Sequence, residues 1–295
     1  MRVVRLRAPG ELALEEAPRP RPAAGEALVR VHAAAITRGE LEWPLDRLPA
    51  IPSYELSGVV EEVGPDVAGL APGDEVFALT LFDRDGVAAE YAALDAGLLV
   101  ARPRRLSHAE SAALPLPGLT AWQGLFDHGR LQPGERVLIH GGAGAVGGLA
   151  VQLARGRGAH VLATASAGGL VRELGAHEAI DPAAFSGVEP VDFVFDTVGG
   201  ERLRRSPAVL REGGRLVSIA EQPPGGVYFV VEPHHEALAS LAADDTLRAP
   251  AVEVFPLASA REAFARSVQP GRRGKVVLAP RTTASAGAAG ARRPG

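Results

Sequence analysis

The chain of 295 residues contains no cysteine. It therefore cannot form a disulfide framework, bind zinc through thiolates or use a cysteine nucleophile. Lysine is almost absent as well, because Lys275 is the only one and arginine carries the remaining basic charge. The 31 basic and 35 acidic side chains give a net charge of −4, without a long basic cluster. We therefore expect no nucleic-acid partner.

Long apolar segments are also missing. No uninterrupted apolar run reaches the roughly 18 residues that a membrane span needs. Pro9, Gly10 and Glu11 interrupt the N-terminal segment before a signal core can form. We therefore expect a cytoplasmic protein with no membrane partner. The composition, 46% hydrophobic and 22% charged, is that of a globular protein, and the length fits two domains.

The pattern of expected secondary structure changes at about residue 115. Before it, short apolar segments lie between Gly and Pro turns and predict a β-rich module: 27–35, 58–63, 74–81 and 91–100. After it, strands alternate with helical stretches and predict a parallel sheet: strands at 136–140, 160–164, 191–197 and 215–220. A helix at 257–267 and a strand at 274–278 follow. We expect residues 1–114 plus 255–280 and residues 115–254 to form the domains, and residues 281–295 to be a disordered tail.

A glycine-rich loop at residues 141–147 follows the apolar strand, and a helical pattern begins directly after it. Gly142 permits a tight strand-to-helix turn, Gly144 lets the backbone approach a pyrophosphate, and Gly147 allows the helix to pack closely on the strand. The N–H groups at the helix start, at Ala145 and Val146, would hold the diphosphate. A glycine loop between a strand and a helix predicts a dinucleotide site.

The end of the next strand bears on the choice of dinucleotide. In NAD-binding sites an acidic residue there bonds the ribose 2′-hydroxyl, but Thr164 and Ser166 occupy this end and no carboxylate comes before Glu173. A small polar end admits a 2′-phosphate, so we expect NADPH. The alternative is that Thr164 and Ser166 cap the next helix. The nearby arginines that could bind a 2′-phosphate are 155, 157 and 172.

Short motifs along the chain resemble the medium-chain dehydrogenase/reductases, in their zinc-free quinone oxidoreductase-like branch. Besides the glycine loop, they lie at 31–37, 57–64, 73–76, 118–122, 196–200, 213–217 and 274–278. The resemblance implies an α/β fold in which a doubly wound Rossmann sheet is inserted into a β-rich, GroES-like catalytic domain. It also implies a cleft between the two, where nicotinamide meets substrate.

The residues at the family's zinc positions differ from those of its zinc enzymes. Zinc-dependent relatives use a cysteine and a histidine where this chain has Thr37 and Tyr54, which are poor zinc ligands. We therefore expect no metal. Reduction of a quinone or an α,β-unsaturated carbonyl puts charge on a conjugated oxygen and can rely on hydroxyl and backbone donors. The resemblance thus implies NADPH-dependent reduction of such a small molecule, with the proton coming from water or a tyrosine.

The resemblance also implies roles for individual residues. We expect Thr37 to bond cofactor or substrate, or else its own backbone. Tyr54 is a candidate hydrogen-bond or proton donor, or else a packed aromatic, and Glu55 a possible loop anchor. Lys275 lies near the cofactor in relatives, although a solvated strand-end charge is an equal reading. The remaining cofactor candidates are Thr120, Thr197, Val198, Gly199, Ile219, Ala220, Phe229 and Val230, and the aromatic substrate-pocket candidates are Trp43, Phe82 and Trp122, with Phe126.

Two other functions stay open. The first is an enoyl-thioester or polyketide-type tailoring reductase, which a basic entrance for a phosphopantetheine arm would favour. The second is an NADPH-binding redox sensor with little turnover, which the replacements at Thr37 and Tyr54 would suit. We also expect a homodimer, with the apolar run Val227–Val231 as an edge strand at its interface.

Overall fold

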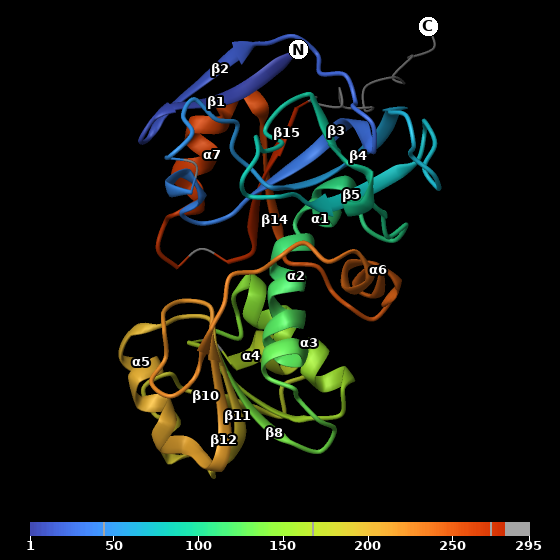
Figure 1. Ribbon diagram of the computed structural model, residues 1–295. Coiled ribbons are helices and arrows are strands. Elements are labelled where there is room, and N and C mark those ends of the chain that lie inside the picture. Colours follow the sequence, from blue (N-terminus) through green and yellow to red (C-terminus); the bar gives the residue numbers. More distant parts are fainter. Residues whose placement is uncertain (44, 167, 272, 281–295) are drawn as a thin grey trace, which may run out of the picture.

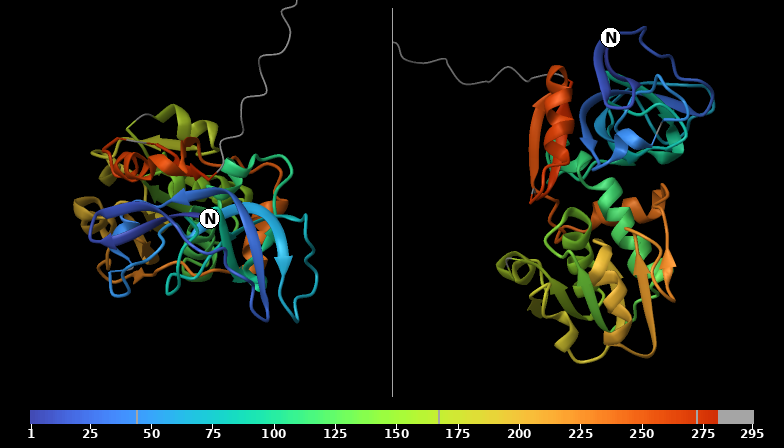
Figure 2. Two further views of the ribbon diagram at one scale, coloured as in Figure 1. Left: turned by 90° about the horizontal axis from the view of Figure 1, so that it is seen from above. Right: turned by 90° about the vertical axis from the view of Figure 1, so that its left-hand side faces the viewer.

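Two lobes, each built around one sheet, make up the protein (Figure 1). The computed structural model describes residues 1–280 except 44, 167 and 272. The predicted tail at 281–295 therefore lies outside the described residues. The chain builds most of the first lobe, passes into the second, and returns so that its last strand lies beside strands from the N-terminal half (Figure 2).

The first lobe contains a seven-stranded sheet in the order β14-β15-β3-β4-β5-β7, with β6 also paired to β3. The long strands β3 and β4 are antiparallel, and β15 pairs with β3 on its other side. Around this sheet lie a β1–β2 hairpin, the short helices η1 and η2, and helices α1 and α7. The bounds are β1 Arg2–Ala8, β2 Glu11–Glu16, β3 Glu26–Ile36, η1 Glu40–Glu42, β4 Glu55–Val63, β5 Glu75–Leu79, β6 Tyr91–Asp95, η2 Ala96–Leu98, β7 Val100–Ala101, α1 His108–Ala112, β14 Val252–Pro256, η6 Leu257–Ser259, α7 Ala260–Ser267 and β15 Lys275–Ala279.

The second lobe contains a six-stranded parallel sheet in the order β10-β9-β8-β11-β12-β13. This is the doubly wound order of a dinucleotide-binding fold, in which the strand order reverses beside the first strand. The expected α/β fold class is thereby confirmed. The bounds are α2 Pro115–Trp122, η3 Gln123–His128, β8 Arg136–His140, α3 Ala145–Gly156, β9 His160–Thr164, α4 Gly168–Glu173, β10 Glu178–Ile180, η4 Phe185–Gly187, β11 Val191–Asp196, α5 Gly200–Arg205, η5 Ser206–Val209, β12 Leu210–Ser218, β13 Val227–Tyr228 and α6 His235–Ala243.

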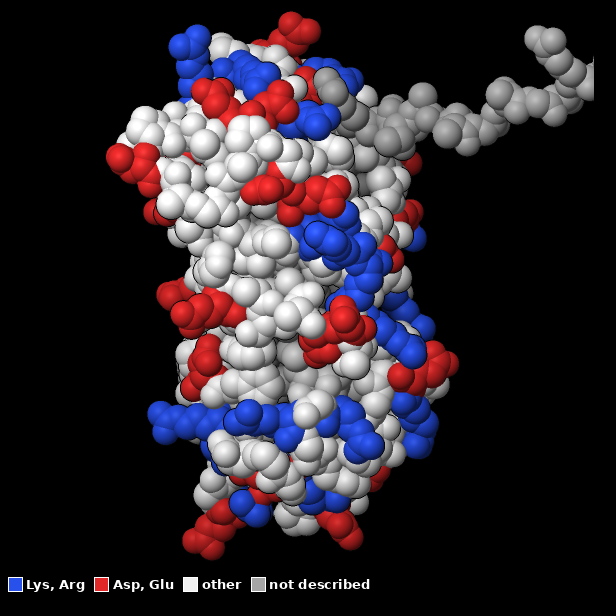
Figure 3. All heavy atoms as spheres, turned by 90° about the vertical axis from the view of Figure 1, so that its right-hand side faces the viewer, with Lys and Arg blue, Asp and Glu red and all other residues white. Residues whose placement is uncertain are grey.

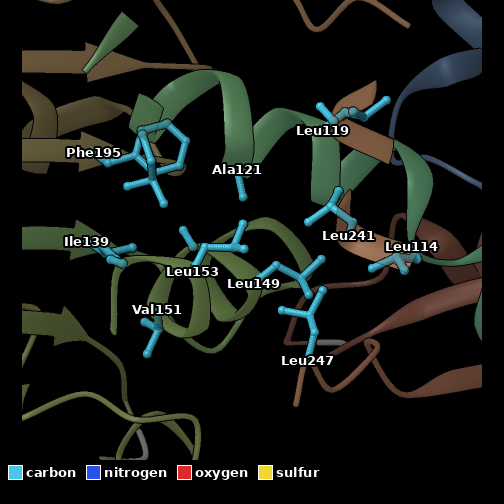
Figure 4. Packing of buried hydrophobic residues seen from close by; sticks show 14 of the residues in the cluster. Leu114, Leu119, Ala121, Ile139, Leu149, Val151, Leu153, Phe195, Leu241 and Leu247 are labelled. Carbon is cyan, nitrogen blue, oxygen red and sulfur yellow. The ribbon is translucent and has the colours of Figure 1, made fainter. Parts of the chain in front are cut away.

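One hydrophobic cluster joins the two lobes. It includes Tyr54 and Phe77 of the first lobe together with Leu119 of α2 and Phe195 of β11. In Figure 4, Leu149 and Leu153 of α3, Ala121 of α2 and Phe195 extend into the space between the helices and the sheet. Helix α2, at the waist of the molecule, thus packs against helices α3 and α6 while contacting β5 of the first lobe.

The return to the first lobe comes slightly earlier than expected. Strand β14 begins at Val252 and pairs in parallel with β15, so the crossing lies before Val252 and not at residue 255. The expected edge strand at residues 227–231 is only two residues long, because pairing with β12 ends at Tyr228. Among the described residues, no helix is long and apolar enough to cross a membrane.

Candidate active site

The glycine loop turns tightly between β8 and α3. Gly141 has a φ of 79°, in the region that favours glycine. A Cβ on Gly142 would lie 2.8 Å from the Ala163 side chain, and a Cβ on Gly147 would lie 2.2 Å from the Gly141 carbonyl oxygen. Gly144 is the exposed N-cap of α3. The loop is therefore too tight for side chains at 142 and 147.

The start of α3 suits an anion. The first N–H groups of a helix have no intrahelical partner, and here they belong to Ala145, Val146 and Gly147. Ala145 and Val146 are half-buried, and the Gly144 before them is open to solvent. The helix is 12 residues long, so its dipole adds a positive potential at this end. These residues fit the diphosphate of a dinucleotide, as the sequence predicted.

Thr164 does not face a ribose site. It is 1% exposed, and its Oγ1 accepts a hydrogen bond from the Gly141 N–H at 3.2 Å and lies 3.3 Å from His140 Nδ1. His140 is equally buried, and burial lowers its pKa to about 4, so this ring is neutral near pH 7. The expectation of a ribose contact at Thr164 is therefore corrected: the side chain points inward because it holds the glycine loop.

Ser166 lines a cleft at the end of β9. This cleft of about 680 Å³ is also lined by Arg202 and Arg205 of α5. Its wall includes the acidic side chains Asp181 and Glu201, although Arg204 pairs with Glu201 at 3.2 Å. Arg202 makes no side-chain hydrogen bond or ion pair within the described part of the chain. The sequence analysis missed both cleft arginines, because α5 is far from Ser166 in sequence.

A buried aspartate shapes the end of β11. Asp196 accepts hydrogen bonds from the Gly199 N–H at 2.9 Å and the Ser218 hydroxyl at 2.8 Å, and burial raises its pKa. Thr197 donates to the His140 carbonyl oxygen at 2.8 Å. Val198 stays 42% exposed. The turn after β11 therefore lies against the first glycine of the loop, since a Cβ on Gly141 would meet Thr197 Oγ1 at 2.5 Å.

The other residues predicted to contact the cofactor differ in exposure and in their contacts. Ile219 is half-buried and Ala220 exposed, after β12. Phe229 is 8% exposed and packs against the His128 ring, whereas Val230 is 61% exposed. Thr120 is 3% exposed and its hydroxyl donates to the Leu116 carbonyl oxygen of its own helix. Phe229 and Thr120 therefore have structural contacts that the sequence did not predict, and their contact with a cofactor stays a prediction.

Thr37 belongs to a buried polar network. Lys275 Nζ donates to Thr37 Oγ1 at 2.8 Å, and Thr37 Oγ1 donates to Glu55 Oε2 at 3.0 Å. Lys275 also forms a direct ion pair with Glu55. Glu55 is 0% exposed and Lys275 only 6%, while Thr37 is half-buried. The reading of Lys275 as a solvated charge is therefore wrong, because the strand pairing of β15 with β3 buries its side chain against β4.

A second buried carboxyl lies beside this network. Glu40 Oε2 accepts the Thr37 backbone N–H at 2.8 Å, and Oε1 accepts the Ser53 backbone N–H at 3.1 Å. Burial is the main cause that raises the pKa of Glu40 to about 8, against the lowering effect of these two bonds and of Lys275. The group thus holds a proton near neutral pH. The sequence analysis did not single out Glu40, because its neighbours in the chain give no sign of burial.

Tyr54 lies in an aromatic cluster with Trp43 and Phe82. The ring centroids are 5.3 to 5.7 Å from the Tyr54 ring. Tyr54 is 1% exposed, and its hydroxyl accepts a hydrogen bond from Arg47 at 3.1 Å. Burial raises the pKa of Tyr54. The packed-aromatic alternative fits this placement, and a role in proton donation stays a prediction.

The predicted residues thus form three groups. Trp43, Tyr54 and Phe82 are together in the first lobe, whereas Trp122 packs on Phe126 in a separate pair. The glycine loop and the end of β11 meet at the edge of the second sheet. Thr37 and Lys275 form the third group. Within the described ranges, no group of three or more His, Cys, Asp and Glu side chains is placed to hold a metal ion.

A small cleft lies between the glycine loop and the segment that precedes Lys275. Gly144 and Ala145, from the glycine loop and α3, line a cleft of about 100 Å³ with Arg273 and Gly274. Gly274 immediately precedes Lys275 in the chain. A larger cleft, about 1020 Å³, contains none of the glycine-loop residues. Thr37 lines another cleft, of about 300 Å³, with residues of the first lobe. The segment before Lys275 thus borders the glycine loop, and the place of the buried network relative to a bound dinucleotide stays a prediction.

Comparisons with known proteins match both lobes. Residues 23–104 match the alcohol dehydrogenase GroES-like domain, and residues 145–239 match the family described as zinc-binding dehydrogenase. The solved structure of the quinone oxidoreductase from Coxiella burnetii is similar over 95% of this chain and 99% of that one, with 30% identity and a TM-score of 0.86.

Two curated relatives are similar over shorter stretches. The NADPH-dependent alkenal/one oxidoreductase, chloroplastic, of Arabidopsis thaliana is 36% identical over 239 residues, which are 73% of this chain. The spectinabilin polyketide synthase system protein NorB of Streptomyces orinoci is 45% identical over 177 residues, which are 57% of this chain. The matches span 61% of the first relative and 8% of the second.

Proposed function

Because the chain belongs to the medium-chain dehydrogenase/reductase superfamily, we propose that it reduces a quinone or an α,β-unsaturated carbonyl compound with NADPH and without a metal ion. The observation that carries the proposal is the donor set of the buried network. Where the family's zinc enzymes have metal ligands, this chain has a hydroxyl, Thr37, bonded to an ammonium and a carboxylate. Hydroxyl and ammonium groups donate hydrogen bonds to oxygen and do not ligate zinc.

This donor set suits a conjugated acceptor. Reduction of an isolated ketone develops a full alkoxide charge, which zinc stabilises in enzymes that carry it. Hydride addition to a conjugated system spreads that charge over an enolate or a quinol, which a hydrogen-bond donor can stabilise. The similarity to a quinone oxidoreductase and to an alkenal/one oxidoreductase supports this substrate class.

The residues present fit a dinucleotide. The tight loop, into which a Cβ at Gly142 or Gly147 would intrude, and the N-terminus of α3 would hold the diphosphate. When bound, the nicotinamide supplies the hydride. The turn at Thr197, Val198 and Gly199 would border the cofactor at the carboxyl edge of the sheet, where ligands bind in doubly wound folds. Thr37 would donate a hydrogen bond to the substrate oxygen.

Preference for NADPH over NADH has support from the cleft at the end of β9. The end of β9 itself carries no carboxylate that could bond a ribose 2′-hydroxyl, and Ser166 lines the same cleft as Arg202 and Arg205. Arg202, whose guanidinium has no hydrogen bond or ion pair among the described residues, could bind a 2′-phosphate, a group that guanidinium binds well. Asp181 and Glu201 on the same wall oppose this preference, so Arg202 is the decisive residue.

Nucleotide titration followed by turnover tests the proposal. Fluorescence titration measures the affinity for each nucleotide, and we expect NADPH to bind more tightly than NADH. We also expect the absorbance of the reduced nicotinamide to fall when a quinone or an enone is added. Arg202→Gln should weaken NADPH binding about 10- to 100-fold and leave NADH binding unchanged, since one charge-assisted bond contributes roughly 1.5–3 kcal/mol. Arg204→Gln, which loses only its pair with Glu201, is the control. Binding of neither nucleotide would reject the cofactor assignment.

A second candidate is reduction of an enoyl-thioester on a polyketide-type carrier. The similarity to a protein of a polyketide synthase system favours it. In Figure 3, basic side chains form a row across the lower part of this face, where a phosphate-bearing arm would find positive charge. Including acyl-thioester enoates in the substrate panel separates the two: a kcat/KM far above that of every free enone would favour the carrier-bound substrate.

A homodimer through the edge of the second sheet is a further part of the proposal. The edge strand β13 leaves Val227 and Tyr228 each 42% exposed, and Val230 beyond it 61% exposed. An exposed apolar strand edge is suited to pairing with a second copy. Light scattering should give twice the mass of the chain at micromolar concentration. Only monomer there would reject the dimer.

A further inference from the structure

The only lysine of the chain is buried in a hydrogen-bonded network that the proposed function does not fully use. Lys275 is 6% exposed, and its ammonium donates to both Thr37 Oγ1 and Glu55 Oε2. Burying an ammonium and a carboxylate together costs several kcal/mol per ion before their attraction is counted. A buried charge pair beside a candidate active site is therefore a candidate for chemistry as well as for stability.

The three side chains contact one another in a closed triangle. Glu55 Oε1 is held by the Leu116 backbone N–H of α2 at 3.0 Å, so the carboxylate is fixed at the junction of the two lobes. Its other oxygen, Oε2, receives both the Lys275 ammonium and the Thr37 hydroxyl. Glu55 is fully buried, Lys275 nearly so, and Thr37 is the member with exposed surface. Any exchange of protons with a ligand passes through Thr37.

Resting on the proposed function, we propose that Lys275 supplies the proton that completes the reduction, through the hydroxyl of Thr37. Thr37 is the catalytic residue that touches the substrate. Lys275 acts through it, and Glu55 is a positioning residue that holds the ammonium beside the hydroxyl. The direct contact of Lys275 with Thr37, at 2.8 Å, is what a proton transfer between them requires.

The step balances in protons and electrons. When bound, the reduced nicotinamide would supply a hydride, to carbon of an enone or to oxygen of a quinone, and would leave an enolate or a quinol anion for the residues of this chain to protonate. The Thr37 hydroxyl, which donates to Glu55 Oε2 in the structure, turns towards the substrate anion, and its O–H bond breaks as the anion takes that proton. A Lys275 N–H bond breaks as the Thr37 hydroxyl is restored, and the resulting amine takes a proton from water after the product leaves.

A purely structural ion pair predicts different behaviour from a relay. If Lys275 and Glu55 only joined β15 to β4, replacing both by uncharged side chains of similar shape would be tolerated, because no charge would be left buried without a partner. The variant Lys275→Met with Glu55→Gln makes this replacement and keeps the acceptor for the Leu116 N–H. We expect it to fold and to bind NADPH within about threefold of the wild type.

Kinetics of this double variant are the first test. We expect its kcat with an enone to fall about 100-fold or more, in the range that a positioned proton donor contributes. Thr37→Val should lose rate similarly and Thr37→Ser should recover it. Thr80→Val, which removes a buried hydroxyl without a hydrogen-bond partner in the described part of the same lobe, is the control.

The single lysine allows a second test that does not depend on turnover. Protein labelled with ¹⁵N-lysine has one side-chain signal, from Lys275. A substituted phenol, whose oxygen imitates an enolate, is added with NADP⁺. The Lys275 signal should shift in the wild type and in Thr37→Ser, but not in Thr37→Val.

The outcomes separate the two proposals. Wild-type turnover together with full activity of the double variant would overturn the relay and leave the reductase function standing. Absence of wild-type turnover with every acceptor would overturn the function, and the phenol titration would still decide the relay. A Lys275 signal that responds equally with and without the Thr37 hydroxyl would overturn the relay in either case.

Discussion

Replacing Gly147 by alanine should damage the dinucleotide site from inside helix α3. The added Cβ would lie 2.2 Å from the Gly141 carbonyl oxygen, 2.7 Å from its carbonyl carbon and 3.0 Å from Gly142 Cα. All three are backbone atoms, so no side chain can rotate away. The helix start and the loop must instead move apart by nearly 1 Å, and these are the groups that would hold the diphosphate.

The cost follows from two opposing effects. Alanine in a helix interior gains roughly 1 kcal/mol over glycine, whereas overpacking against fixed atoms costs about 1–3 kcal/mol. We therefore expect a net loss of up to about 2 kcal/mol in the free energy of unfolding. We expect the affinity for NADPH to fall about 10- to 100-fold, because the displaced N–H groups no longer converge on the phosphate oxygens.

Gly148 provides the matched control, because it is the next residue of the same helix. A Cβ there would lie 3.2 Å from Leu174 Cδ1, the end of a flexible side chain, and 3.5 Å from the Gly142 carbonyl oxygen. Gly148→Ala should therefore leave stability equal or higher and NADPH binding within about twofold of the wild type, since the helix gain of about 1 kcal/mol remains. Urea unfolding and NADPH fluorescence titration measure both variants. If Gly147→Ala bound NADPH as tightly as Gly148→Ala, the reasoning about the loop would be refuted.

Three further predictions concern stability and the aromatic cluster. Burial lowers the pKa of His108 and of His140 to about 4 and raises that of Glu40 to about 8. Stability should therefore fall as pH drops from 6.5 towards 4, where the unfolded histidines take up protons. It should also fall, by about 1.4 kcal/mol per pH unit, as pH rises from 6.5 to 8, because folded Glu40 keeps a proton that the unfolded chain has already lost above about pH 4.5. Denaturation at a series of pH values gives the free energy of unfolding. Its dependence on pH should become weaker on the alkaline side in Glu40→Gln and on the acid side in His140→Gln. Tyr54→Phe should keep most of kcat, because its hydroxyl bonds to Arg47, and lose about 1–2 kcal/mol of stability; a loss of kcat near 100-fold would restore Tyr54 as a proton donor. Leu119→Ala, in the core that joins the lobes, should cost about 2–5 kcal/mol in urea unfolding, and a cost below 1 kcal/mol would contradict the packing described.

Parts of the fold with strong local patterns could be predicted from the sequence. Strands β8 and β9 have the expected bounds, because each is a buried apolar run with a turn after it. The glycine loop was recognised because its spacing has a steric cause, which the close approach of Gly147 to Gly141 makes visible. The edge strand β13 was placed but overextended, since apolar residues continue after its pairing ends.

The side-chain partners of the site depend on contacts between distant segments. Lys275 meets Thr37 and Glu55 only because β15 returns from the end of the chain to pair with β3. Thr164 is the last residue of β9, and Ser166 follows it by two residues; both carry a hydroxyl. Thr164 is buried whereas Ser166 lines a cleft, and the residue types alone do not predict this difference. Arg202 approaches that cleft from α5, which follows β11.

The most direct test of the central claim is turnover by protein stripped of metal. The chain is treated with a strong chelator, its metal content is measured by mass spectrometry, and NADPH oxidation is followed with a quinone and with an enone. The account predicts an unchanged kcat in protein that holds far less than one metal ion per chain. Activity that disappears with the metal and returns on adding zinc would contradict it.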